Sequence, residues 1–203
     1  MKYPEINVGT STQLNIVGPE HPMWQNVVTH VQQRYQLAFM ANVKQSMPAY
    51  LALIDNSNIL SVCGFRAAEN EALYLEQYLD CPAEQLVSKL FNCSISRANL
   101  VEFGHLASFT KGLSPLHFYL IAELLVEQGF EWCIFTATDP LHALMMRLGL
   151  EPKLIAEASP SKVNDAQQIW GSYYDTHPKV YAGNLSKGLS RLRMLQQRKI
   201  KQA

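Results

Sequence analysis

Residues whose side chains can do chemistry are concentrated between Val101 and Leu125. This stretch opens with Val-Glu-Phe-Gly-His-Leu, continues as a polar loop, and then reaches Ser114-Pro115, a pair typical of a helix N-terminus. A strand that leads into a helix N-terminus brings unpaired backbone N–H groups together. The segment therefore predicts a site for an anion.

The anion is expected at Lys111, Gly112, Leu113 and Ser114, where this helix begins. A lysine ammonium can meet a phosphate there, and glycine lets the backbone approach it closely. The pyrophosphate of coenzyme A is a natural occupant. The alternative is a plain turn at Gly112 beside a solvated lysine, and a single glycine does not decide between the two.

Glu102 is the candidate general base or water-positioning group, because it is the carboxylate of an otherwise apolar strand. Burial would raise its pKa and let it take a proton from an attacking amine. The alternative is an exposed or salt-bridged strand residue. His105 is a second catalytic candidate with the same two interpretations.

A glycine inside this strand predicts a β-bulge at Gly104-His105. A bulge interrupts the hydrogen-bond ladder and leaves backbone N–H groups open. We expect Leu106 and Ala107 to offer such groups to a thioester carbonyl, with Ser108 beside them on the donor side.

Tyr173 is the candidate general acid, within the run Trp-Gly-Ser-Tyr-Tyr-Asp that ends at Asp175. A phenol near a positive site can protonate a departing thiolate. The alternative is a packed aromatic corner. His117 and His142 have apolar helical neighbours, so we interpret both as structural.

Hydrophobic periodicity predicts the elements that must position these residues. Strands are expected at 14–17, 49–54, 59–65, 100–106, 132–136, 153–156 and 179–182, and helices at 22–39, 82–91, 114–128, 139–148 and from 184. Residues 73–79 are expected to form a short strand or turn. No repeat or Pro/Gly-rich linker divides the chain, so we predict one domain over residues 1–203.

Composition excludes several functional classes. The 17 basic and 17 acidic residues balance, which disfavours nucleic acid as a partner. The four cysteines lack zinc-ligand spacing and are expected to be reduced, mostly packed thiols. Serine-hydrolase, nucleotide-binding and zincin motifs do not occur. Without a signal-like or membrane-spanning stretch, a cytoplasmic location is expected.

The C-terminal segment, about 184–201, is predicted to be a basic helix. Its leucines repeat at helical spacing, and no acidic residue follows Asp175. Such a helix can bind an acidic carrier protein or an anionic membrane surface. The alternative is a helix docked on the body through its apolar stripe, with solvated cations.

Six segments of the chain resemble the thermostable hemolysin family of the delta type, and together they span nearly the whole sequence. They are CGFRAA at 63–68, LYLEQYLD at 73–80, VEFGHLAS at 101–108, FTAT at 135–138, RLGL at 147–150 and WGSYYDT at 170–176.

The resemblance implies a layered α/β fold similar to the GNAT acyl-CoA N-acyltransferases and the acyl-homoserine-lactone synthases. A central mixed, mostly antiparallel sheet would be flanked by helices. Arg66, a further catalytic candidate, would precede an apolar-acidic segment, and Glu102 would lie on the central strand. The acyl donor would lie between strands ending near Leu106 and Thr136. Two positions depart from the family pattern: His105 replaces an asparagine, and Leu116-His117-Phe118 stands where an arginine is expected.

These features predict an N-acyltransferase that moves an acyl group from acyl-CoA or an acyl-carrier protein to an amine. No tightly bound cofactor and no metal are expected. Two alternatives stay open: a membrane-active thermostable hemolysin, which would use the basic tail, and a catalytically silent GNAT-like binding module.

Overall fold

The computed structural model of the protein describes residues 6–7, 12–108 and 114–202. Within them, an 8-stranded sheet has the order β1-β2-β3-β4-β5-β6-β8-β7. β5 and β6 pair in parallel, whereas the other neighbouring strands are antiparallel. The strands are β1 (Ile6–Asn7), β2 (Thr12–Val17), β3 (Ala49–Asp55), β4 (Asn58–Ala67), β5 (Leu100–Ser108), β6 (Trp132–Ala137), β7 (Lys153–Glu157) and β8 (Lys179–Asn184).

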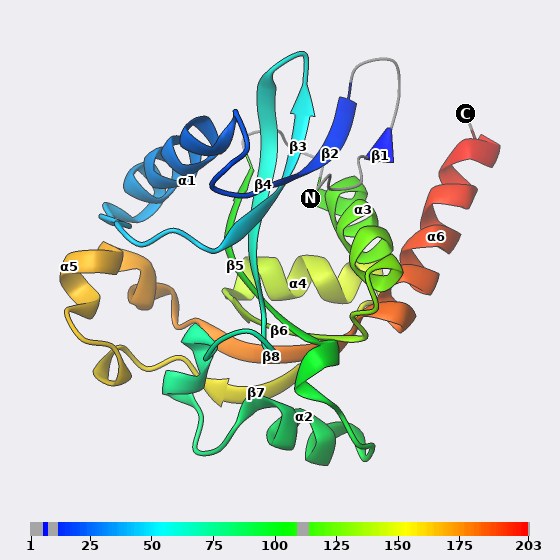
Figure 1. The fold of residues 1–203 in the computed structure, drawn as a ribbon. Helices are drawn as coiled ribbons and strands as arrows, with labels where there is room; N and C mark the ends of the chain where they lie inside the picture. Colours follow the sequence, from blue (N-terminus) through cyan, green and yellow to red (C-terminus); the bar gives the residue numbers. More distant parts are fainter. Residues whose placement is uncertain (1–5, 8–11, 109–113, 203) are drawn as a thin grey trace.

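Helices connect and cover these strands (Figure 1). The α-helices are α1 (Trp24–Phe39), α2 (Ala83–Phe91), α3 (Ser114–Glu127), α4 (Asp139–Leu148), α5 (Ala166–Trp170) and α6 (Leu185–Gln202). Short 3₁₀-helices are η1 (Tyr74–Tyr78), η2 (Arg97–Asn99), η3 (Pro160–Lys162) and η4 (Gly171–Thr176).

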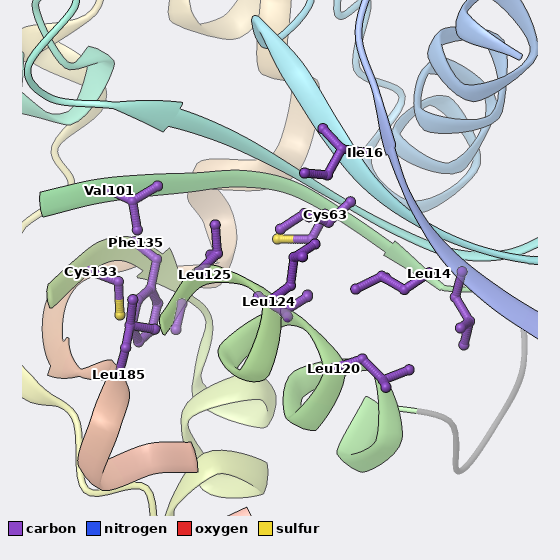
Figure 2. Packing of buried hydrophobic residues seen from close by; sticks show 14 of the residues in the cluster. Leu14, Ile16, Cys63, Val101, Leu120, Leu124, Leu125, Cys133, Phe135 and Leu185 are labelled. Carbon is purple, nitrogen blue, oxygen red and sulfur yellow. The ribbon is translucent and has the colours of Figure 1, made fainter. Parts of the chain in front are cut away.

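The sheet buries side chains on both faces. On one face, α1 packs its Val27, Val28 and Val31 against β2, β3 and β4. On the other face, α3 and α6 lie side by side, and Leu120, Leu124 and Leu185 are among the residues that join the strands in one core (Figures 1 and 2). Removing this apolar surface from water stabilises the layered arrangement.

The predicted layered α/β fold and mostly antiparallel sheet are confirmed. Each long predicted element forms, and left-handed caps end helices where the sequence suggested, as at Gly149 after α4. Residues 74–78 form the 3₁₀-helix η1, so the prediction of a strand or turn at 73–79 was wrong in type. The side chain of Glu76 accounts for this helix, because it accepts from the Leu73 N–H at 2.9 Å.

The two central strands separate midway along their length. β5 and β6 pair from Leu100↔Trp132 to Phe103↔Phe135, although β5 continues to Ser108 and β6 to Ala137. At the same point the ladder between β4 and β5 shifts register by one residue, and His105 adopts a left-handed φ of 52°. The predicted β-bulge at Gly104-His105 is therefore confirmed.

At Gly171 the connection between α5 and η4 packs closely against the end of α1. Its φ of 54° and ψ of −127° lie in a region that is accessible almost exclusively to glycine. A Cβ atom at this position would overlap the carbonyl oxygen of Phe39. Nearby, the Ser172 hydroxyl donates to that same carbonyl at 3.2 Å. The close approach of the two backbones therefore requires glycine.

We expect Gly171→Ala to lower the free energy of unfolding by about 2–4 kcal/mol, because backbone strain and a steric overlap add together. Denaturant unfolding measures this difference. Gly129→Ala is the matched control: Gly129 also has a positive φ, 91°, but a Cβ there would meet nothing within 4 Å. Equal losses in the two variants would contradict the proposed contact.

Candidate functional site

A cavity of about 170 Å³ lies on the α1 side of the sheet, and we call it the polar cavity after the titratable side chains among the aromatic and aliphatic residues of its wall. Glu102 and His105 of β5 and Arg66 of β4 line it, so three of the four predicted catalytic residues meet there. The fourth, Tyr173 of η4, lines the same cavity. The structure thus brings together residues that are far apart in the sequence.

Glu102 is buried, with 2% of its surface exposed, so the interpretation as an exposed residue was wrong, whereas an ion pair with Arg66 does form. Its Oε2 accepts from the Leu75 N–H at 2.8 Å, and its Oε1 lies 3.9 Å from Arg66 Nη1. Burial raises the pKa of Glu102 to about 7, although the Leu75 hydrogen bond and the Arg66 charge oppose that rise. Near neutral pH this carboxyl can both accept and release a proton.

The segment that carries Leu75 is held rigidly by a second set of charges. Glu76 of η1 accepts from the Ala83 N–H at 3.0 Å and from Arg97 Nη1 at 2.6 Å. Arg97 Nη1 also donates to Glu84 at 2.8 Å. These bonds lower the pKa of Glu76 to about 2, the Arg97 hydrogen bond being the largest cause. The network therefore fixes the amide that contacts Glu102.

The β-bulge places His105 in the same cavity as Glu102. In a regular strand, residues three apart point to opposite faces, and the extra residue of the bulge reverses that alternation. His105 is buried, and burial lowers its pKa to about 4, with a smaller effect from the charge of Arg66. Its imidazole is therefore neutral at physiological pH.

Hydrogen bonding indicates which ring nitrogen of His105 carries the proton. The Tyr50 hydroxyl accepts from the Met47 N–H at 3.1 Å and lies 3.2 Å from His105 Nδ1. Because the phenol oxygen already accepts a bond, we assign its own proton to the bond with Nδ1. His105 Nε2 then carries the ring proton and is a hydrogen-bond donor.

Aromatic rings form one wall of the polar cavity. Tyr35 of α1 contacts the rings of His105, Trp170 and Tyr173, with centroid distances of 5.8, 5.9 and 6.4 Å. The Tyr173 hydroxyl donates to Thr136 Oγ1 of β6 at 3.1 Å, and burial raises the pKa of Tyr173. Tyr173 is therefore protonated, as a general acid must be, and it is also packed among aromatic rings, as in the alternative of an aromatic corner.

A larger cavity of about 610 Å³ occupies the gap between β5 and β6, and we call it the apolar cavity. It extends between α3, α4 and α6, where Phe118, Leu144 and Leu192 are among its lining residues. Leu106 and Ser108 of β5 also line it, whereas Ala107 belongs to the α1-side core. Two of the three predicted donor-side residues of β5 thus contact this cavity.

The polar and apolar cavities meet at the bulge. Both are lined by Tyr35, Phe103, Gly104, His105, Thr136 and Tyr173. The two cavities are therefore adjacent at the point where the central strands part.

Lys111, Gly112 and Leu113 lie outside the described residues. Ser114 is the first residue of α3, so the predicted start of this helix is confirmed. The prediction that these four residues bind a phosphate stays a prediction.

The remaining predictions concern structural residues. His117 is fully buried and joins Ser61 Oγ at 2.7 Å to the Leu51 carbonyl at 3.1 Å, which supports the structural interpretation. Cys63 and Cys133 line the apolar cavity, and burial raises the pKa of each to about 12. Both are thus neutral thiols and poor nucleophiles.

The C-terminal helix α6 docks on the body through its apolar stripe, as the alternative interpretation proposed. Leu185, Leu189 and Leu192 are buried, and Arg193 forms an ion pair with Glu123 of α3 at 3.1 Å. In the described part of the chain, helices that combine the length and the hydropathy of a membrane span do not occur.

Sequence reasoning did not identify Tyr35, Tyr50 and Thr136 as site residues. Tyr35 belongs to the apolar face of a helix and Tyr50 to a buried strand, so the packing pattern explained both. Trp170 and Tyr74 belong to two of the segments that resemble the family, but their residue types alone did not assign them to the site. The repeated aromatic residues of those motifs were the one signal that pointed to a cavity wall.

Known structures share this fold. LasI, an AHL synthase, aligns with a TM-score of 0.58 and 12% identity over 87% of this chain and 91% of its own. FeeM, an N-acyl amino acid synthase from uncultured soil microbes, aligns with a TM-score of 0.56 and 10% identity over 89% and 94%. MesI, a CoA-dependent acyl-homoserine lactone synthase, gives 0.55 and 10% over 90% and 94%. No curated protein matches the sequence.

The chain therefore has the GNAT-like fold of acyltransferases, with a buried carboxyl where the central strands part. The family model of the thermostable hemolysins matches residues 17–189. The protein belongs to the thermostable hemolysin family.

The burial of Glu102 predicts a pH-dependent difference in stability. Its folded-state pKa, about 7, exceeds its ordinary value of 4.5, so the folded protein binds this proton more tightly. The stabilisation that this bound proton gives the folded protein is fully present below pH 4.5 and is lost as pH rises through 7. The free energy of unfolding of Glu102→Gln, measured relative to the native chain, should therefore rise by about 3 kcal/mol from pH 5 to pH 8.

Urea denaturation at several pH values measures this gain. Glu69→Gln is the control, because Glu69 is exposed. A Glu102→Gln difference that stays constant with pH would mean that the carboxyl is not desolvated.

Proposed function

We propose that the protein is an N-acyltransferase that moves an acyl group from a thioester to an amine. One observation carries this proposal: an apolar cavity between parted central strands meets a polar cavity that contains a buried carboxyl. The acyl chain fits the first cavity and the amine fits the second. Their shared border at His105 is where the two reactants would make contact.

The reaction needs two proton transfers, and the site offers a group for each. The amine nitrogen attacks the thioester carbonyl while Glu102 takes the proton that the amine loses. A C–N bond forms and the C–S bond breaks. Tyr173 gives its proton to the departing thiolate, and for this transfer its hydroxyl turns away from Thr136 Oγ1, to which it donates at 3.1 Å.

Charge on the carbonyl oxygen needs donors that are in place before reaction. His105 Nε2–H can donate from the bulge, and backbone N–H groups of β5 near Leu106 and Ala107, as the sequence predicts, would complete the set. The family asparagine that His105 replaces also ends in an N–H donor. A neutral histidine can therefore preserve that role.

The donor is an acyl-CoA or an acyl-carrier protein thioester. Its phosphate end would bind at Lys111 to Ser114, as the sequence predicts. The volume of the apolar cavity, about 610 Å³, and its lining by residues of α3, α4 and α6 favour an acyl chain longer than acetyl. The names of LasI, MesI and FeeM support acylation of an amino group as the reaction class.

Incubation of the purified protein with acyl-CoA thioesters should raise its thermal stability. A ligand at 100 times its Kd stabilises by about 2.7 kcal/mol. With an accepted amine, Glu102→Gln should lower kcat by about 10²–10⁴-fold and leave acyl-CoA binding intact. Release of CoA thiol and calorimetric titration measure these two quantities.

Glu69→Gln serves as the matched control for loss of a carboxylate and should keep full activity. Retained acyl-CoA binding without turnover in the native chain, unchanged by Glu102→Gln, would indicate a silent binding module instead. Absence of binding to every acyl-CoA and acyl-carrier protein would count against the whole proposal.

Gly188 offers a test of where the acyl chain lies. It lines the apolar cavity from the first turn of α6, and a Cβ there meets only Leu150 Cδ2 at 3.6 Å. We expect Gly188→Leu to weaken binding of long-chain acyl-CoA by about tenfold or more while acetyl-CoA binding is kept, since a leucine fills the cavity without straining the helix. Ser190→Leu, an exposed position of the same helix, is the control. Equal loss for short and long chains would place the acyl group elsewhere.

A further inference from the structure

Arg66 is buried but poorly satisfied, which is unusual for a guanidinium. It is 8% exposed and has one long hydrogen bond, from Nη1 to the Ala72 carbonyl at 3.5 Å. Its Nε lies 3.3 Å from Glu71 Oε2, but the contact is not aligned as a hydrogen bond. Among the described residues Nε–H thus finds no acceptor, although buried polar groups are almost always paired.

Arg97, on the neighbouring η2, shows what a structural arginine looks like in this protein. Its Nε donates to the Ala68 carbonyl at 2.9 Å, and its Nη1 and Nη2 donate to Glu76 at 2.6 and 3.0 Å. All three of its nitrogens are used, although it is the more exposed of the two side chains. Arg66 therefore keeps hydrogen-bond donor capacity that a ligand can use.

The surroundings of Arg66 identify the kind of partner. It lines the polar cavity, and in the β4–β5 ladder it pairs directly with Glu102. A buried guanidinium fork binds a carboxylate through two parallel hydrogen bonds. Since an amine must face Glu102 in the proposed reaction, the ligand carries its amine and its carboxylate close together.

We propose that the acceptor is an α-amino acid with an aromatic or apolar side chain, its carboxylate on Arg66 and its amine at Glu102. The two groups of an α-amino acid flank a single carbon, and the two side chains are separated by 3.9 Å between Arg66 Nη1 and Glu102 Oε1. The aromatic wall of Tyr35, Trp170 and Tyr173 then receives the side chain. The inference rests on the proposed acyltransferase function.

Calorimetric titration of the full chain with L-phenylalanine and with phenethylamine tests the carboxylate contact directly. The two ligands share the ring and the amine, and phenethylamine lacks the carboxylate. We expect L-phenylalanine to bind about 10- to 100-fold more tightly, as a charge-assisted hydrogen-bond pair implies. L-aspartate, whose side chain is charged, should bind more weakly than L-phenylalanine.

Arg66→Gln should abolish this preference by weakening L-phenylalanine alone, and Arg66→Lys should retain part of it. Arg147→Gln, the same change at an exposed position of α4, should leave both affinities unchanged. Thermal melts check that each variant is folded. If Arg66→Gln does not fold, Arg66→Lys and the native ligand pair decide the outcome.

Equal affinity for the two ligands in the native chain would overturn the inference, as would a preference that survives Arg66→Gln. In the transfer assay with acyl-CoA, acylation of phenethylamine but not of L-phenylalanine would overturn the inference and leave the acyltransferase function standing. Acylation of neither amine would overturn the proposed function, while the titrations would still decide whether Arg66 binds the carboxylate.

Discussion

The candidate site depends on one extra residue in β5. A strand that kept its alternation through Gly104 would point His105 away from Glu102, and its ladder could continue along β6. The bulge instead ends the pairing at Phe103↔Phe135 and turns His105 toward the polar cavity. The cost is a non-glycine residue at a left-handed φ, a strain that proteins often retain at functional sites. The gap between the strands and the constellation of side chains thus have one common cause.

A second constraint is the desolvation of Glu102. A buried carboxyl keeps a raised pKa only where its surroundings are fixed, because relaxation of the protein or entry of water would restore its ordinary pKa. The Arg97–Glu76–Glu84 network and the turn of η1 hold the Leu75 amide against it. Charges that never contact the cavity therefore control the protonation of the residue that does. In the same way, Gly171 brings the Trp170–Tyr173 segment against α1.

The fold was largely predictable because it follows periodicity. Strands and helices formed where apolar residues alternated or recurred every three to four positions, and the glycine in β5 signalled the bulge. The site was predictable only where a residue broke its local pattern, as Glu102 does. Tyr35 and Tyr50 were missed because each obeys its pattern, and only the fold shows that they face His105. Arg66 became a candidate through family resemblance, and its unsatisfied Nε was visible only in the coordinates.

The separation of β5 from β6 also affects how the two parts of the sheet are joined. The antiparallel meander from β1 to β5 and the trio β6, β8 and β7 share only the four residue pairs between Leu100 and Phe103 on β5. Beyond those pairs the two parts of the sheet are joined by packing rather than by the ladder. On one face α3 and α6 cover both parts, and on the other Tyr173 of η4 contacts Tyr35 of α1 and donates to Thr136 of β6. A ligand bound in the gap would contact both strands, because residues of β5 and β6 line the apolar cavity. Binding in this gap would then connect the two parts of the sheet through the ligand.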